Sequence, residues 1–313
     1  MKAVLLIDEA VGETRRLLVD ETGAPFRLDV RRVPQLDASP RLGDVWAGRV
    51  ASSLPGKAGW FVELGSGPAG VLSVRKGASF HEGERVTVAI RAEAWAGKGP
   101  LLTLASVPAS AATGDLGRIR VSETDPFLKG ISVVETETGV SARQQIDAAI
   151  EEALQRVTPL PGGGDIAIER SRALTAIDID AGSRTGAHGS RFAEELNRAG
   201  AAAAARQISL RALGGLAVVD FLAMPAADAR KGVLEHFRKA LDRFLEVRAD
   251  VLGISRFGLC ELSIPRGRAP LSEALGGAGQ GERQALDLDT NDRERRCRQS
   301  WRAAACARAC RGA

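Results

Sequence analysis

The chain has 313 residues, of which 44% are hydrophobic and 26% charged, and its formal net charge at pH 7 is +4. This length is enough for two domains with separate cores, and no apolar run approaches the roughly 18 residues that a membrane-spanning helix needs. A five-residue apolar run at the N-terminus is followed by Asp8 and Glu9, which is too short and too acidic for a secretory signal. We therefore expect a cytoplasmic protein with no membrane partner.

Residues 42–104 have the pattern of a small β-barrel. Short runs with rough alternation of apolar and polar residues, separated by Gly, Pro and Ser, are typical of a closed barrel of the OB type. The runs are GDVWAGRV, GWFVELG, AGVLSV and ERVTVAI. Nucleobases stack on exposed aromatic side chains in such barrels. Phe61, with Trp46 and Trp60 nearby, is the best candidate for this role, and Lys98 is a candidate for contact with a phosphate, although strand aromatics more often belong to a core.

Residues 105–161 form a connecting segment. We predict a loop to about residue 141 and an amphipathic helix over about residues 142–157, because apolar side chains recur there at the spacing of one helix face. These side chains are Ile146, Ile150, Leu154 and Val157.

Three aspartates at the ends of two apolar runs are the most informative feature of the sequence. Asp178 and Asp180 end the run ALTAIDID, and Asp220 lies near the end of LAVVDF. Alternate side chains of a strand share one face, so Asp178 and Asp180 are expected to point the same way. Carboxylates crowded on one patch repel each other and need a cation, and hard oxygen ligands of this kind suit Mg²⁺.

The segment between the two acidic runs predicts that they lie side by side. Apolar residues recur at helical spacing over about residues 190–213, and Gly214 and Gly215 follow as a stop. A strand, a helix and a second strand in this order form a parallel crossover, which brings both strand ends to the same edge of a sheet. Asp178 and Asp220 are therefore expected to meet. The alternative is that each aspartate only caps the turn after its strand.

Two arginines are further candidates for this site. Arg184 lies in the glycine-flanked loop after Asp180, and Arg256 lies in the sequence SRFG. Loops that follow strand ends often carry sites in open α/β sheets, which favours a role for Arg184. The alternatives are a plain exposed turn for Arg184 and a surface salt bridge for Arg256.

The last segment, residues 279–313, is expected to be a basic and flexible tail. Seven arginines and one acid, Glu294, lie between Arg293 and Arg311. The four cysteines of the chain include no C-x-x-C pair, which argues against a zinc site. They are Cys260, Cys297, Cys306 and Cys310.

Three ordered motifs between Gly162 and Leu275 carry a family resemblance. They are GGGDIAIERSRALTAIDIDAG, ARQISLRALGGLAVVDFLAM and ISRFGLCELS. Together they resemble the catalytic domain of the bacterial ribonuclease E/G family. Residues 42–104 resemble the S1 RNA-binding domain that this family carries before its nuclease, and KGPLLT matches the exit from that domain.

The resemblance implies an α/β plus all-β fold. The S1-like OB barrel would be inserted in a reduced RNase H-like subdomain, which residues 1–41 and a later, shortened segment at residues 105–161 form by pairing their strands. An α/β catalytic domain of the DNase I-like type would follow over residues 162–278, and then the tail.

The resemblance also implies a function. It points to a Mg²⁺-dependent endoribonuclease that cuts single-stranded RNA in rRNA or mRNA processing or decay. Asp178 and Asp220 match the two family aspartates that hold the Mg²⁺, and Asp180 would position the attacking water or the metal's shell. Arg256 matches a basic position close to the family's active site, and Arg184 and Arg256 would neutralise charge on the phosphate as the transition state forms. Contacts to RNA are expected from Phe61, Lys98, Arg184 and Arg256.

Several features depart from the family pattern. Asp180 stands where the family usually has Asn, and Val71 stands where it often has a second aromatic residue. We find no counterpart of the Arg-Thr pair that grips a 5′ phosphate, so we expect entry at internal sites without sensing of a 5′ monophosphate. The family's C-P-x-C motif is also missing, so no zinc-linked tetramer is expected, while oligomerisation by other contacts stays open.

These departures keep two other hypotheses open. One is a non-catalytic S1-type RNA-binding protein derived from the same family, which the substitutions at Asp180 and Val71 favour. The other is an enzyme that acts on the phosphate of a small nucleotide, which fits the acidic site but leaves the barrel without a purpose.

Overall fold

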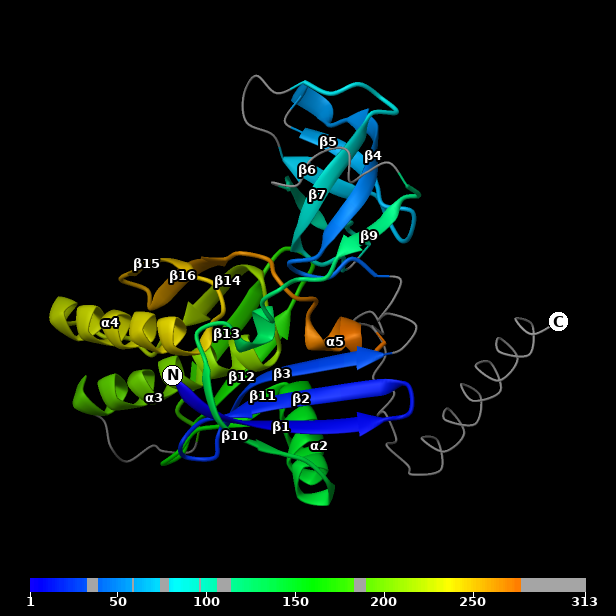
Figure 1. Ribbon diagram of the computed structural model, residues 1–313. Coiled ribbons are helices and arrows are strands. Elements are labelled where there is room, and N and C mark those ends of the chain that lie inside the picture. Colours follow the sequence, from blue (N-terminus) through cyan, green and yellow to red (C-terminus); the bar gives the residue numbers. More distant parts are fainter. Residues whose placement is uncertain are drawn as a thin grey trace.

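The computed structural model describes residues 1–32, 39–57, 59–73, 79–95, 97–105, 114–182 and 190–276. In this part of the chain, a β-barrel stands over a body of two further sheets and their helices (Figure 1). Arg184, the tail at residues 279–313 and three of the four cysteines lie outside the described residues.

The barrel is closed by five strands, which confirms the OB-like prediction. The strands follow the order β5-β6-β8-β7-β4, and an additional pairing of β5 with β4 closes the ring. A sixth strand, β9, pairs antiparallel with β4 from outside residues 42–104. The bounds are β4 Val45–Ser53, β5 Gly59–Glu63, β6 Gly70–Ser73, β7 Arg85–Ala92, β8 Leu101–Leu104 and β9 Gly117–Arg120, with a short 3-10 helix, η1, at Pro55–Lys57.

A four-stranded sheet forms the second part of the fold, in the order β10-β1-β2-β3. The N-terminal strand β1 pairs in parallel with β10, so the expected pairing of the first residues with a later segment is confirmed. Helix α2 packs its buried residues against this sheet. The bounds are β1 Lys2–Ala10, β2 Glu13–Val19, β3 Pro25–Arg32, β10 Ser132–Glu137 and α2 Val140–Leu154, with a 3-10 turn, η3, at Pro126–Leu128.

Two details of the connecting segment differ from the prediction. The stretch expected to be a loop to about residue 141 contains β9, η3 and β10, because its backbone finds distant strand partners in β4 and β1. Helix α2 ends at Leu154, and Val157 begins strand β11 instead of extending the helical stripe. The side chain of Val157 is 47% exposed, since the strand pairing with β12 replaces the helical register there.

The third part is a six-stranded sheet in the order β11-β12-β13-β14-β16-β15. Strands β13 and β14 are parallel and are joined through helix α3, so the predicted crossover is confirmed. The other neighbours are antiparallel. The bounds are β11 Val157–Pro159, β12 Asp165–Arg170, β13 Thr175–Asp180, α3 Ser190–Leu210, β14 Gly215–Asp220, α4 Ala227–Phe244, β15 Asp250–Ile254, β16 Leu259–Ile264 and α5 Leu271–Ala274.

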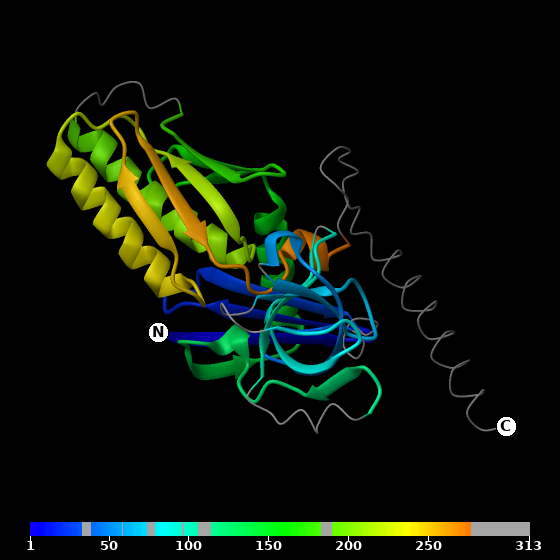
Figure 2. The same cartoon turned by 90° about the horizontal axis from the view of Figure 1, so that it is seen from above.

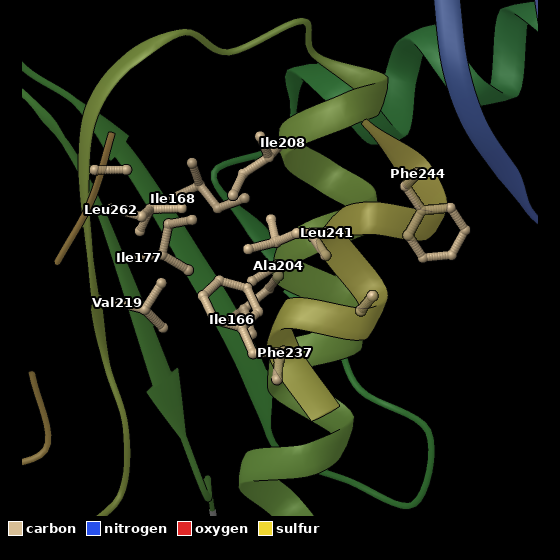
Figure 3. Close-up of a cluster of buried hydrophobic side chains, with 14 of the residues drawn as sticks. Ile166, Ile168, Ile177, Ala204, Ile208, Val219, Phe237, Leu241, Phe244 and Leu262 are labelled. Carbon is tan, nitrogen blue, oxygen red and sulfur yellow. The ribbon is translucent and has the colours of Figure 1, made fainter. Parts of the chain in front are cut away.

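One face of this sheet is buried under helices α3 and α4 (Figures 1 and 2). Strict alternation in β13 and β16 sends every second side chain into that core, as a half-buried strand requires. Figure 3 shows Ile177 and Val219 from neighbouring strands facing Phe237 and Leu241 of α4. The residues that alternate with them along the strands point to the opposite face of the sheet and are partly or fully exposed. This opposite face carries the aspartates.

A largely buried charged cluster joins the barrel to the body. Arg268, which follows β16, donates from Nε to Oε1 of Glu246 over 2.7 Å, and its Nη1 lies 3.7 Å from Oδ1 of Asp29. Glu93, at the end of the barrel strand β7, accepts a hydrogen bond of 2.9 Å from the backbone N–H of Ala269. Charges buried in this way are stable only when they are paired, so the cluster fixes the barrel to the sheets beneath it.

This cluster predicts how stability changes in acid. Burial alone would raise the pKa of Asp29, but neighbouring guanidinium groups lower it from 3.8 to about 2. The guanidinium groups belong to Arg268, Arg31 and Arg16. Because the pKa of Asp29 is lower in the folded state, its ionised form stabilises the fold above pH 4, and this stabilisation is lost as the pH falls towards 2.

We expect Asp29→Asn to remove about 1 kcal/mol of the stability difference between pH 6 and pH 3. The measurement is the urea dependence of unfolding at both pH values for the wild type and the variant. Asp228→Asn is the control, because the Asp228 side chain is 98% exposed. Equal losses of stability between pH 6 and pH 3 in the wild type and Asp29→Asn would contradict the assignment.

Within the described residues, no helix combines the length and the apolar character needed to cross a membrane.

Candidate active site

Asp178 and Asp220 lie side by side on neighbouring parallel strands. They are direct partners in the register of β13 and β14, and both side chains are exposed on the face opposite the helices. Residues in direct register present their side chains to the same face of a sheet. The predicted meeting of these two carboxylates is therefore confirmed as geometry.

The electrostatics of the pair favour a cation. The pKa of Asp220 is raised, first by partial burial of its carboxyl group and then by the negative charge of Asp178. Both effects disfavour two ionised carboxylates with no counter-charge between them. A bound cation would reverse both effects, because it stabilises the ionised form of each group.

The donor set fits Mg²⁺. This ion binds proteins through one or two carboxylates and keeps several of its waters, and two exposed carboxylates in register supply that arrangement. In the described ranges, no cluster of three or more His, Cys, Asp or Glu side chains is close enough to hold a metal ion. Any ion held by Asp178 and Asp220 would therefore complete its coordination with water or with substrate oxygens.

Asp180 lies two residues beyond Asp178 on the same face. Its Oδ1 accepts a hydrogen bond of 2.7 Å from the backbone N–H of Gly182. This contact is the turn-capping arrangement that was the alternative interpretation for each aspartate. Its side chain remains exposed, and Asp165 of β12 is its direct register partner.

The turn between β15 and β16 lies beside Asp220. Gly258 has a φ of +93°, and a Cβ atom there would overlap the carbonyl oxygen of Phe221 and lie 3.4 Å from Oδ1 of Asp220. A glycine is therefore required for this close approach. Arg256 is exposed in the same turn, so the structure brings this predicted residue to the edge where the acidic pair lies.

The segment that follows Asp220 is held by a residue that the sequence did not single out. Asn197 of α3 is fully buried, its Nδ2 donates to the carbonyl oxygen of Leu222 over 2.9 Å, and its Oδ1 accepts from the N–H of Leu222 over 2.9 Å. This double contact fixes the chain two residues beyond the carboxylate. A polar residue within an otherwise apolar helix stripe was the available signal.

The predicted RNA-binding residues of the barrel line one cavity. It has a volume of about 410 Å³, and its lining includes Phe61, Val71 and Lys98 together with Arg266 from the segment after β16. Phe61 is the direct register partner of Val71 and is partly exposed. No sequence pattern predicts Arg266 here, because it reaches the barrel only through the tertiary fold.

The other aromatic residues of this region have structural contacts. Trp46 is buried in the barrel core, as strand aromatics usually are. Trp60 packs edge-on against Phe80 with ring centroids 6.2 Å apart. Trp95 lies between the barrel and the body, with the guanidinium carbons of Arg170 and Arg266 at 4.2 and 5.0 Å from its ring centroid.

The barrel and the turn between β15 and β16, which lies beside Asp220, are toward opposite ends of the six-stranded sheet (Figure 2). Strand β16 spans this separation, from Leu259, the register partner of Asp220, to Ile264 just before Arg266. Five residue steps at about 3.4 Å each give a strand length of about 17 Å. Figures 1 and 2 place the barrel on the side of this sheet that is opposite α3 and α4, which is also the side of the aspartates.

Comparison with known proteins finds a family and relatives that match part of the chain. Residues 117–267 match the Ribonuclease E/G family. The chain is 39% identical over 151 residues to "Ribonuclease E" of Escherichia coli, which is 48% of this chain and 14% of that protein. It is 38% identical over 151 residues to "Ribonuclease E" of Haemophilus influenzae, which is 48% of this chain and 16% of that protein.

A plant relative matches over a similar stretch. The identity to "Ribonuclease E/G-like protein, chloroplastic" of Arabidopsis thaliana is 35% over 127 residues, which is 40% of this chain and 13% of that protein. The matched part is thus a small share of each relative's length, and the barrel strands β4 to β8 lie before the family match. Residues 117–267, which include the acidic strands and the hairpin beside them, match the ribonuclease E/G family.

Proposed function

We propose that this chain is a Mg²⁺-dependent endoribonuclease that cuts single-stranded RNA at internal phosphodiester bonds. The observation that carries the proposal is the direct register of Asp178 and Asp220 on the open face of the sheet. The match of residues 117–267 to the ribonuclease E/G family supports it. The products would carry a 5′ phosphate and a 3′ hydroxyl, and the physiological role would be rRNA or mRNA processing or decay.

The chain's own residues have separate roles in this proposal. Asp178 and Asp220 would hold Mg²⁺, which when bound would supply a Lewis acid and lower the pKa of a coordinated water. Asp180 orients the water or the coordination shell with the carboxylate oxygen that Gly182 does not use. Arg256 neutralises charge that develops on the phosphate, because its exposed guanidinium is in the turn beside Asp220.

The barrel binds the RNA at a distance from the bond that is cut. In the cavity, Phe61 offers an aromatic ring for base stacking, and Lys98 and Arg266 offer positive charge to the backbone. An RNA held there would continue along the open face of the sheet past β16, which spans about 17 Å from Leu259 to Ile264, before it reaches the acidic pair. This separation means that binding and cleavage use different nucleotides of one strand.

The proposal is tested with the purified chain and a single-stranded RNA that is labelled at one end. Internal cuts that need Mg²⁺ would support the endonuclease, and removal of Mg²⁺ with EDTA is expected to stop them. Tight binding of intact RNA with no cuts would instead favour the non-catalytic RNA-binding protein. Neither binding nor cutting would favour an enzyme that acts on a small nucleotide.

The non-catalytic alternative rests on specific residues. Asp180 stands where the family usually has Asn, and its interaction with Gly182 is a turn cap that needs no metal. Such a protein would retain the barrel and its cavity for binding RNA, while the aspartates would have no catalytic role. Cleavage by the wild-type chain decides between the two.

Two substitutions in the cavity are expected to change the affinity for RNA in opposite directions. Phe61→Ala is expected to weaken binding of single-stranded RNA by about 5- to 150-fold, because one stacked base contributes about 1–3 kcal/mol. Val71→Phe is expected to strengthen binding, because residue 71 is the direct register partner of Phe61 and would add a second ring to the cavity. Fluorescence anisotropy with a labelled oligonucleotide measures both changes.

Phe61→Trp serves as the matched control, because it keeps an aromatic face at the same position. We expect it to bind RNA within a fewfold of the wild type. A similar loss in Phe61→Ala and Phe61→Trp, with unchanged unfolding curves, would contradict the stacking role.

A further inference from the structure

The tip of the β15–β16 hairpin carries the most exposed of the large hydrophobic side chains in the described ranges. Phe257 is 86% exposed, although a phenylalanine is among the residues most often found in a core. The roles proposed for the aspartates and Arg256 do not explain why an aromatic side chain is so exposed at this position.

The turn that presents Phe257 is held firmly. The Oγ of Ser255 accepts hydrogen bonds from the N–H groups of Phe257 at 3.3 Å and Leu259 at 3.2 Å. The backbone of Ser255 pairs with Leu259 at 2.8 Å and accepts from Gly258 at 3.1 Å. The ring therefore extends from an ordered backbone, and its exposure is a property of the fold.

Phe257 lies next to the acidic pair. The following residue, Gly258, approaches the carboxylate of Asp220 so closely that a Cβ atom on it would be 3.4 Å from Oδ1. Its carbonyl oxygen also accepts a hydrogen bond of 3.1 Å from the N–H of Phe221. Consecutive Cα atoms are about 3.8 Å apart, so a nucleotide whose phosphate lies at the aspartates has bases within reach of the ring.

The residues around the Phe257 ring indicate which kind of ligand it would contact. Leu259, the register partner of Asp220, is 40% exposed and adds an apolar surface on the face of the aspartates. Arg256 adds a positive charge beside the ring, while the carboxylates repel any anion that is not accompanied by a cation. A neutral flat base joined to a phosphate matches this combination of an aromatic ring, an apolar surface and a guanidinium.

We propose that Phe257 is a base-stacking platform for the nucleotide adjacent to the phosphate held at Asp178 and Asp220. This inference rests on the proposed function of that pair. Stacking on an aromatic ring tolerates any base, because every base has a π face. The platform would hold the RNA on the cleavage side, as Phe61 holds it in the barrel.

The test uses the full chain with Asp220→Asn, so that RNA is not cut, and fluorescein-labelled RNA in the presence of Mg²⁺. A series of oligonucleotides, each lacking one base at a successive position, is compared with the intact sequence by fluorescence anisotropy. With Phe257 present, loss of one particular base should weaken binding by about 5- to 150-fold. When Phe257→Ala is added to Asp220→Asn, loss of that same base should leave the RNA affinity unchanged.

Two further variants separate stacking from simple apolar contact. Phe257→Leu keeps a large apolar side chain without a π face, and should behave as Phe257→Ala does. Phe257→Trp should restore sensitivity to that base, and its indole fluorescence should be quenched when the intact RNA binds. Val140→Ala, at another exposed apolar position on α2, is the control and should leave the pattern unchanged.

The outcomes distinguish this inference from the proposed function. If the wild-type chain cuts RNA but the base-deletion pattern is the same with and without Phe257, the platform is wrong and the nuclease stands. If the chain never cuts RNA but one base depends on Phe257, the nuclease is wrong and the stacking contact stands. Self-association that Phe257→Ala abolishes, with RNA binding unchanged, would overturn the platform in favour of a protein interface.

Discussion

Replacing Asp220 by Asn is expected to lower the kcat for RNA cleavage by about a thousandfold or more. Bound Mg²⁺ provides several kcal/mol of charge stabilisation in a transition state, and each 1.36 kcal/mol corresponds to about a tenfold change in rate. The amide keeps the size of the carboxylate but loses its charge, so Asp178 alone would have to hold the ion. The measurement is single-turnover cleavage of a labelled RNA at several Mg²⁺ concentrations.

The fold should survive this change. Asp220 is exposed, and its pKa is raised because its partly buried carboxyl group lies beside the negative Asp178, so removal of one charge relieves repulsion. Unfolding in urea should therefore show equal or slightly higher stability in Asp220→Asn. Glu261→Gln is the matched control, because Glu261 is an exposed acid on the same sheet face, two residues along β16 from the partner of Asp220. Similar activity losses in both variants would mean that general negative charge, and not the pair, is responsible.

Arg268→Met is expected to have the largest effect on stability. The pKa of Arg268 is raised, because Glu246 and Asp29 stabilise its charge more than burial disfavours it. Its Nη1 also donates to the carbonyl oxygen of Leu28 in β3 over 2.8 Å. The substitution takes one guanidinium away from both Glu246 and Asp29, and truncating one partner of a buried ion pair costs about 3–5 kcal/mol.

The measurement is the midpoint and slope of urea unfolding. Arg191→Met is the matched control, since the Arg191 side chain is 92% exposed and pairs with Glu195 on the same helix. That substitution should cost no more than about 0.5 kcal/mol. A loss below about 1 kcal/mol in Arg268→Met would show that the cluster contributes little to holding the fold.

The acidic pair could be predicted from the sequence because two local patterns determine it. The alternation of apolar and acidic residues in TAIDID fixes which face Asp178 and Asp180 share, and the same period continues in β14. The helix between the strands then permits only a parallel crossover. No contact beyond these neighbouring elements was needed to bring Asp178 to Asp220.

The remaining features depend on contacts between distant parts of the chain. Strand β10 reads as a loop by itself, since its burial pattern has no clean alternation, and only its pairing with β1 makes it a strand. Arg266 enters the barrel cavity and Arg268 enters the charged cluster because the segment after β16 passes beneath the barrel. Local periodicity contains no information on such contacts.

Val157 shows that a local pattern can also predict the wrong element. Its spacing from Leu154 and Ile150 fits one helix face, yet Gln155 already has extended backbone angles and ends α2. The backbone from Val157 to Pro159 pairs with β12 instead. The gain from sheet pairing outweighs the weak helical preference of a β-branched residue.

The parallel pairing of β1 with β10 has a consequence for synthesis on the ribosome. β1 begins at Lys2 and its partner begins at Ser132, with the whole barrel between them. At about 5–20 residues per second, translation of that interval takes roughly 6–26 s. During this time the edge of β1 that will pair with β10 has no native partner, and an unpaired strand edge readily forms hydrogen bonds with strands of other chains. Slow elongation through the barrel would therefore favour aggregation of the nascent chain at its first strand.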